Sequence, residues 1–427
     1  MKVSAFVQRR AVYILAAAYF AAHLPLVAPS LEDIDSINFA LGLRDFDPAR
    51  HQPHPPGSPV YIVLGRVMLA LIGSASHPTS RSAAEALALG ILSAIAGAVA
   101  IVAAADVFKG LLNRGPTGGD VPPSAQRLTV WATALLAGSP LFWLSGLRPM
   151  SDLPGLAVAL LAQALILRGR TDRRALLYGA LASGLAAGLR VQTVWLTVPL
   201  LGLALFEQRG AGAAWLVTRP IAAITAGGLA WAIPLVADSG GIDGYLRALG
   251  SQTGEDFAWV HMLWLDPTPR RLAFALYETF VLPWGSTALA ILMAVLCSAG
   301  AILVLLRERS AALVLLLGFA PYAVFHLLFQ ETITVRYALP TLPAIAWLAA
   351  RGMMVAGRFA PLVAAPVLGA ALIVALPTGV AYGREPHPVF QAIADEVMHR
   401  ISALVDEAYR ASDTSDANQA TDPERLT

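Results

Sequence analysis

The chain has 427 residues, of which 57% are hydrophobic and 14% are charged. A typical soluble domain carries about 25% charged residues, so this composition excludes an ordinary soluble domain. The net charge of +2 and the scattered basic residues exclude a nucleic-acid-binding chain. The single cysteine, Cys297, lies inside an apolar run, which excludes an intrachain disulfide and a Cys-based metal cluster.

Twelve apolar runs approach the length of a bilayer-crossing helix, which predicts an all-α polytopic membrane protein. In chain order they are 11–29, 59–73, 83–108, 128–147, 153–167, 175–189, 191–206, 220–237, 284–306, 311–329, 337–350 and 360–377. The first follows Lys2, Arg9 and Arg10, but no A-x-A-like cleavage site comes after it. We therefore expect an uncleaved first helix and not a signal peptide.

Charge balance indicates that one of the twelve runs does not cross. With a cytoplasmic N-terminus, twelve crossings would place the basic loop 168–174 outside, against the positive-inside rule. Run 59–73 contains Arg66 and follows the Pro-rich segment 53–59, so we assign it to the outer interface. About eleven transmembrane helices remain. More than half of the 30 Lys and Arg residues then lie on the cytoplasmic side, with the acids Asp106, Asp120, Asp172, Glu207 and Glu308.

This topology predicts a multi-pass protein of the cell (inner) membrane, with the N-terminus cytoplasmic and the C-terminus outside. Residues 1–378 form one transmembrane module, with outer loops at 30–82 and 238–283. Apolar residues at helical spacing predict a short outer amphipathic helix within 379–410. The polar tail 411–427 is predicted to be disordered.

The first outer loop, 30–82, holds most of the polar signals. Its apolar residues at 34–43 predict a short amphipathic helix lying on the membrane. Glu32, Asp33 and Asp35 crowd the first turn of this helix, where the helix dipole favours negative charge, so the acids either cap the helix or form a catalytic site. His51 and His54 lack the spacing of zinc ligands, so no metal site is indicated.

The same loop carries a family resemblance. Asp35 lies four residues before Phe39, just after the first span, and HPPGSPVY follows at 54–61. This pattern resembles the first loop of polyprenyl-phosphate-sugar-dependent glycosyltransferases of the GT-C fold, the superfamily of protein O-mannosyltransferases and lipid A aminoarabinose transferases. PMSDLPG at 149–155 and RYALPTLP at 336–343 are weaker matches in the same order. The resemblance runs over most of the chain, but only the first loop is specific.

The resemblance implies a GT-C-like fold with two interfacial helices in the first loop, in agreement with the assignment of 59–73. It also implies a membrane hexosyl- or pentosyltransferase that moves a sugar from a polyprenyl phosphate to a protein, lipid or glycan acceptor at the outer face, with inversion. Such a reaction needs a carboxylate as general base and cationic groups for the phosphate. Many relatives need no metal, and no cofactor is indicated.

Position by position, the catalytic Asp of the family falls on Asp35. Asp33 stays open as the alternative, because Ser36 stands where the family often has an acid after the catalytic Asp. Some relatives carry a Lys near the Pro-rich segment that reaches the lipid phosphate, and this chain has none there. Arg336 is therefore the first candidate for the phosphate, against an ordinary interfacial anchor, and the other expected substrate-binding residues are Tyr337, Arg66, Arg190, His54, Asp152 and Glu32.

Arg148, Asp152 and Arg190 lie at outer ends of predicted spans, where charges are costly unless they are paired or hydrated. They mark either a functional cavity or a structural pair between Arg148 and Asp152. Two other classes of function stay open as alternatives. A transporter or flippase of lipid-linked sugars should show repeats and mid-span charges, and a non-catalytic scaffold should not depend on Asp35.

Overall fold

A computed structural model describes residues 2–73, 80–112, 123–208, 215–255, 260, 262–384 and a few positions between 396 and 404. The described residues are nearly all helical and contain no strand, only an isolated bridge between Asp47 and Gln52. The prediction of an all-α chain is confirmed. The predicted helix in 379–410 and the tail 411–427 lie mostly outside the described residues.

The N-terminal half begins with α1 (Lys2–His23), α2 (Ile34–Arg44), α3 (Pro59–Gly73) and α4 (Arg81–Leu112). The predicted run 128–147 is split into α5 (Pro123–Gly138) and α6 (Pro140–Ser145), because proline at the first position of α6 cannot continue the α5 hydrogen bonds. Next come α7 (Asp152–Arg168), α8 (Arg173–Leu189), the 3₁₀ turn η3 (Val191–Thr193) and α9 (Val194–Gln208).

The C-terminal half contains α10 (Trp215–Asp238), α11 (Gly241–Glu255) and α12 (Pro269–Phe280), followed by α13 (Thr287–Arg307) and α14 (Arg309–Phe329). The 3₁₀ segment η7 (Val335–Thr341) leads into α15 (Leu342–Met353), and α16 (Ala360–Arg384) closes the described bundle. Helices α11 and α12 fall in the segment 238–283, which was predicted as an outer loop without a helix.

Five helical stretches in the described ranges have the length and hydropathy of a bilayer crossing. They are Arg81–Leu112, Val217–Asp238, Thr287–Arg307, Arg309–Phe329 and Val335–Arg384. These support a membrane protein, while the number of about eleven spans and the orientation of the termini stay predictions. The 15-residue helix α3 has the bounds predicted for the run that does not cross.

Close helix packing is provided by glycines, as is common between helices in membranes. A Cβ on Gly184 of α8 would come within 2.3 Å of the Ile224 carbonyl oxygen of α10. A Cβ on Gly300 of α13 would lie 1.9 Å from the Leu348 carbonyl oxygen of α15. Both backbones therefore approach to distances that only glycine permits.

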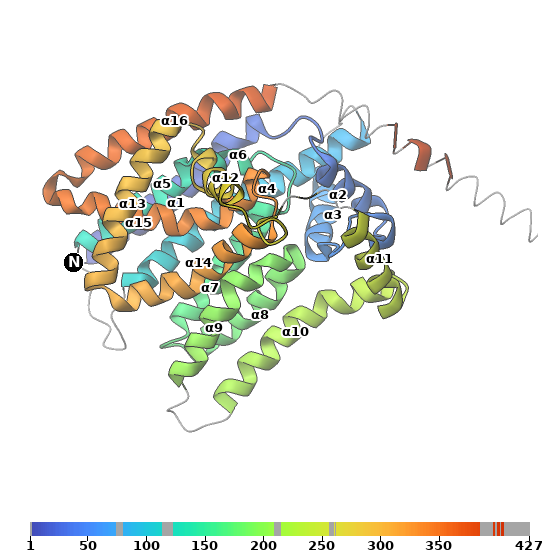
Figure 1. The fold of residues 1–427 in the computed structure, drawn as a ribbon, viewed down its shortest axis with the longest axis horizontal. Coiled ribbons are helices and arrows are strands. Elements are labelled where there is room, and N and C mark those ends of the chain that lie inside the picture. The colour runs from blue at the N-terminus through green and yellow to red at the C-terminus, as the bar shows by residue number, and fades with distance from the viewer. Residues whose placement is uncertain are drawn as a thin grey trace, which may run out of the picture.

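Helices α2, α3 and α11 gather at one end of the bundle, whereas the N-terminus lies at the other end (Figure 1). Helix α2 was predicted as an amphipathic helix on the membrane, and its range is confirmed. However, Ile37, Phe39, Leu41 and Leu43 are buried inside the protein, and of the apolar residues in its sequence only Ile34 is largely exposed. Protein contacts therefore cover most of the apolar surface expected to face lipid.

Candidate functional site

The N-terminus of α2 is fixed by a reciprocal capping box. Asp33 accepts hydrogen bonds at Oδ1 from the backbone N–H groups of Asp35 (2.9 Å) and Ser36 (3.2 Å). In return, the Asp33 backbone N–H donates to Ser36 Oγ (3.1 Å). Capping satisfies N–H groups that have no partner inside the helix. Asp33 thus has the capping role that was one of its two predicted roles, and this role places Asp35 in the first turn.

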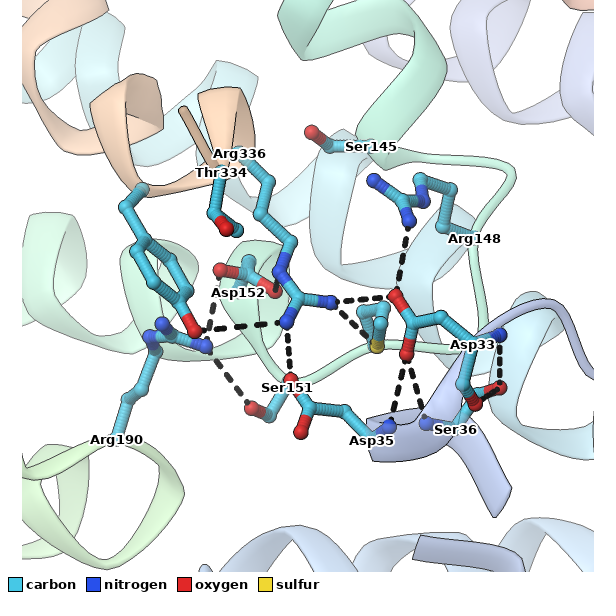
Figure 2. Close-up of polar contacts among 12 residues, drawn as sticks. Asp33, Asp35, Ser36, Ser145, Arg148, Ser151, Asp152, Arg190, Thr334 and Arg336 are labelled. Carbon is cyan, nitrogen blue, oxygen red and sulfur yellow. Dashed lines mark hydrogen bonds and ion pairs between the residues drawn. The ribbon is translucent and has the colours of Figure 1, made fainter. Parts of the chain in front are cut away.

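Arg336 joins Asp33, the N-cap of α2, to Asp35 in its first turn, from 303 and 301 residues further along the chain. Its Nη1 donates to Asp33 Oδ2 (2.9 Å), and its Nη2 donates to Asp35 Oδ2. The Arg336 side chain is only 8% exposed. Its Nε has no hydrogen-bond partner among the described residues and lies 4.0 Å from Asp152 Oδ2 (Figure 2). The planar guanidinium group therefore holds two carboxylates and keeps one buried donor open.

Arg148 contributes a second cation on the other side of Asp33. It donates through Nε to Glu32 and through Nη2 to Asp33 Oδ2 (3.2 Å). The hypothesis that Arg148 pairs with Asp152 is wrong. Arg148 lies in the turn before α7, and Asp152 is the first residue of that helix, so the two side chains do not share a helix face.

Asp152 pairs instead with Arg190, at the corner between α8 and η3. Arg190 Nη1 lies 2.9 Å from Asp152 Oδ1 and also donates to Ser151 Oγ (3.5 Å). Arg190 has an extended backbone (φ −156°) because α8 ends there. Its guanidinium lies 4.9 Å from the Tyr337 ring centroid, and that of Arg336 lies 5.2 Å from the same centroid. Tyr337 therefore contacts both cations through its ring.

His54 closes the site from the loop between η2 (Pro48–Arg50) and α3. Its Nδ1 lies 3.7 Å from Asp35 Oδ1. Asp35 therefore has one oxygen held by Arg336 and a second that faces His54 without a hydrogen bond among the described residues. Both oxygens of Asp33, by contrast, are taken by backbone N–H groups and arginines.

Arg66 is the one predicted site residue that the described contacts do not bring into this cluster. Its Nε donates to the Leu43 carbonyl oxygen (3.0 Å) and its Nη2 to that of Gly42 (3.0 Å). These carbonyls belong to the last turn of α2, where a cation is favourable. Arg66 thus holds the C-terminal end of the helix whose N-terminal end carries the acids.

The two acids of α2 have pKa values shifted in opposite directions. Burial opposes ionisation of Asp35, but the charge of Arg336, helped by His54 and Arg190, outweighs it and lowers the Asp35 pKa below its ordinary value. For Asp33 burial prevails over the opposing charge of Arg336, with Asp35 adding repulsion, and the pKa is raised. Asp35 is therefore the acid that stays ionised to lower pH.

The site thus combines three arginines with four carboxylates from segments far apart in the sequence, and all of these segments were predicted to lie on the outer side. Arg148 was not among the predicted substrate-binding residues, although its place at the end of a predicted span signalled a functional or paired charge. Within the described part of the chain, no group of three His, Cys, Asp or Glu side chains is placed to hold a metal ion. The arrangement offers cations for an anionic group beside a carboxylate with one open oxygen.

Comparison with known proteins adds one match. The family described as Protein O-mannosyl-transferase TMEM260 N-terminal domain matches residues 51–211. No curated protein matches the chain. The matched segment contains His54, Arg148, Asp152 and Arg190, and it does not reach the acids of α2 or Arg336. Over residues 51–211, the chain is similar to the N-terminal domain of a protein O-mannosyl-transferase family.

Proposed function

We propose that this chain is a membrane glycosyltransferase that moves a sugar from a polyprenyl-phosphate donor to an acceptor hydroxyl at the outer face of the cell membrane, with inversion. The observation that carries the proposal is Arg336 bridging Asp33 and Asp35, with one buried donor left open. The name of the matching family suggests mannose as the sugar and a protein as the acceptor. The GT-C fold implied by the first loop is part of the same proposal.

The donor phosphate is assigned to Arg336 and Arg190. A lipid phosphate needs charge-assisted donors, and a guanidinium group can present two of them in one plane. The Arg336 Nε has no hydrogen-bond partner among the described residues and is enclosed beside Asp152, so a phosphate would reach Arg336 by replacing one of its carboxylates. Arg190 uses only Nη1 for its contacts with Asp152 and Ser151 among the described residues. Tyr337 lies against both groups and keeps them side by side.

Asp35 is the proposed general base. It takes the proton of the acceptor hydroxyl while the acceptor oxygen attacks C1 of the sugar, and the C1–oxygen bond to phosphate breaks with its electron pair on the phosphate. Attack opposite to the leaving phosphate inverts C1. Asp33 is the stronger base by pKa, but its oxygens already accept hydrogen bonds from the backbone and two arginines. The oxygen of Asp35 that accepts no hydrogen bond among the described residues therefore favours Asp35 as the base.

The test measures release of polyprenyl phosphate from a labelled polyprenyl-phosphate mannose by purified protein, with and without an acceptor peptide. Asp35→Asn keeps the size of the side chain and removes the base, so turnover should fall by about 10²–10⁴-fold. The matched control is Asp47→Asn, which changes an acid that caps η2 outside the cluster. Full activity of both Asp35→Asn and Asp33→Asn would contradict the proposal and leave a transporter or a scaffold.

A further inference from the structure

A second buried polar network contacts the segment that leads to Arg336. It joins α12 and α14 to residues 330–334, which connect α14 to η7. The side chains of this network are almost fully buried: Glu278 (7% exposed), Thr279 (1%), His326 (0%), Gln330 (6%) and Thr332 (2%). None of them contacts the acids of α2, and the proposed chemistry does not use them.

His326 is bonded through both of its ring nitrogens. Its Nε2 lies 3.0 Å from Thr279 Oγ1, and its Nδ1 lies 3.0 Å from Gln330 Oε1. An amide oxygen only accepts, so Nδ1 must donate to Gln330, and the neutral ring then accepts at Nε2 from the Thr279 hydroxyl. His326 thereby links α12 to the first residue of the connecting segment.

Glu278 provides a second link between the same elements. Its carboxylate accepts a hydrogen bond from the Thr332 hydroxyl. Glu278 and Thr279 are consecutive residues of α12, and they hold Thr332 directly and Gln330 through His326. A buried carboxylate is costly unless it accepts hydrogen bonds, so loss of the Thr332 hydroxyl should weaken this link.

A third contact reaches the site itself. The hydroxyl of Tyr322, on α14, donates to the backbone carbonyl oxygen of Tyr337 (2.8 Å), the residue after Arg336. The same hydroxyl lies 3.3 Å from Gln330 Oε1. Gln330 is therefore shared between the histidine and the tyrosine, and the network extends from α12 to the backbone of η7.

Helix α12 exposes apolar side chains and buries polar ones, the opposite of a helix on the surface of a soluble protein. Its apolar residues Leu272, Phe274 and Phe280 are exposed, whereas Glu278 and Thr279 face inward and are buried. In a water-soluble protein the apolar side would turn inward. The inward polar pair of α12 is thus explained by what it bonds, the segment that leads to Arg336.

We propose that Thr279, Glu278 and His326 are positioning residues that hold the 330–337 segment, so that Arg336 is presented to Asp33, Asp35 and the donor phosphate. This inference rests on the proposed function for the identity of the ligand, but the positioning itself does not. These residues touch neither substrate nor the reacting atoms. They act through Arg336.

The test uses Thr279→Val and Thr332→Val, which keep side-chain shape and remove one hydroxyl each. The matched control is Thr133→Val, because Thr133 is also fully buried but bonds only the Thr129 carbonyl oxygen of its own helix α5 (2.7 Å). The two test variants should raise the KM for polyprenyl-phosphate mannose by about tenfold, since each leaves a buried polar group without its partner. In an Arg336→Lys background they should add little, because groups that act through one residue are not additive.

A second readout does not depend on the donor. Amide hydrogen exchange of 330–337 should become faster in Thr279→Val and Thr332→Val and stay at the wild-type rate in Thr133→Val. Unchanged exchange in both test variants overturns the positioning role, whatever the substrate is. Faster exchange together with no binding of polyprenyl-phosphate mannose by the wild-type protein overturns the proposed donor and leaves the positioning role standing. The positioning role is also overturned if His326→Phe shows the wild-type exchange rate in 330–337 and the wild-type KM.

Discussion

Charged residues are organised differently in the site and in the segments predicted to be cytoplasmic. In the site, Arg336 is shared by Asp33 and Asp35, Asp33 is shared by Arg336 and Arg148, and Arg336 itself is buried. In the segments predicted to be cytoplasmic, Arg170 pairs with Glu207 and Arg351 with Glu308, one cation to one acid. The desolvation of a buried arginine shared between two acids is offset only in part by their attraction, whereas partly exposed one-to-one pairs lose less hydration. We propose that the shared charges of the site serve function, as the proposed transferase reaction requires.

The largest expected effect tests how the site is anchored. Glu85 is fully buried in α4 and accepts two hydrogen bonds from Arg44 at the end of α2 (2.8 and 3.0 Å). Glu85→Gln leaves Arg44 without a counter-charge, so it should cost roughly 3–5 kcal/mol of unfolding free energy. The measurement is thermal unfolding in detergent. Glu308→Gln, which removes the partner of Arg351, is the control and should cost less, because both partners are partly exposed.

The next effect tests the shared arginine. Arg336→Lys keeps the charge but loses the planar group that reaches Asp33 and Asp35 together, so kcat/KM should fall by about 100-fold. Arg351→Lys at the predicted cytoplasmic side keeps a one-to-one pair and should retain activity. Steady-state kinetics with labelled donor measures both. Equal losses in the two variants would show that the network has no special role.

The acid limb of the pH–activity profile distinguishes the two candidate bases. The charge of Arg336 lowers the Asp35 pKa below the ordinary value of an aspartate, so this acid stays ionised, and keeps its stabilising pair with Arg336, until the pH falls below that ordinary value. If Asp35 is the base, the pH of half-maximal activity on the acid limb should therefore lie below the ordinary aspartate pKa. The Asp33 pKa is raised, so with Asp33 as the base the half-maximal pH should lie above the ordinary aspartate pKa. A half-maximal pH above that ordinary value, together with loss of activity in Asp33→Asn, would transfer the role to Asp33.

Much of the site was predictable because its residues come from segments that hydropathy and charge assign to one side of the membrane. Hydropathy and charge predicted that the first loop, the turn before α7, the corner at Arg190 and the segment 330–336 lie on the same side of a membrane, and the structure brings these segments together (Figure 2). The range of α2 followed from its apolar residues and the acids of its first turn. Knowing that these segments lie on the same side of the membrane does not determine which charged residues pair.

One predicted pairing failed because it depended on the position at which a helix begins. Arg148 and Asp152 were a candidate pair because both lie at the outer end of a predicted span, but α7 begins only at Asp152, so Arg148 contacts Glu32, and Arg190 pairs with Asp152. Arg66 was a phosphate candidate because it is a charge in an apolar run, yet its partners are backbone carbonyls that no sequence pattern reveals. Helix α12 was missed because it has no long apolar run, and its polar residues turn inward.

The smallest expected effect completes the comparison from the predicted cytoplasmic side. Arg170 Nε donates to Glu207 Oε2 (2.8 Å), and about a quarter to a third of each side chain is exposed (27% and 35%). Arg170→Gln should therefore change the unfolding free energy by about 1 kcal/mol or less, with the difference shrinking further in high salt because exposed charges are screened. Donor turnover should match the wild type. A loss of turnover in Arg170→Gln comparable to that in Arg336→Lys would mean that the two groups of charges are coupled, and the division between a functional network and structural pairs would have to be abandoned.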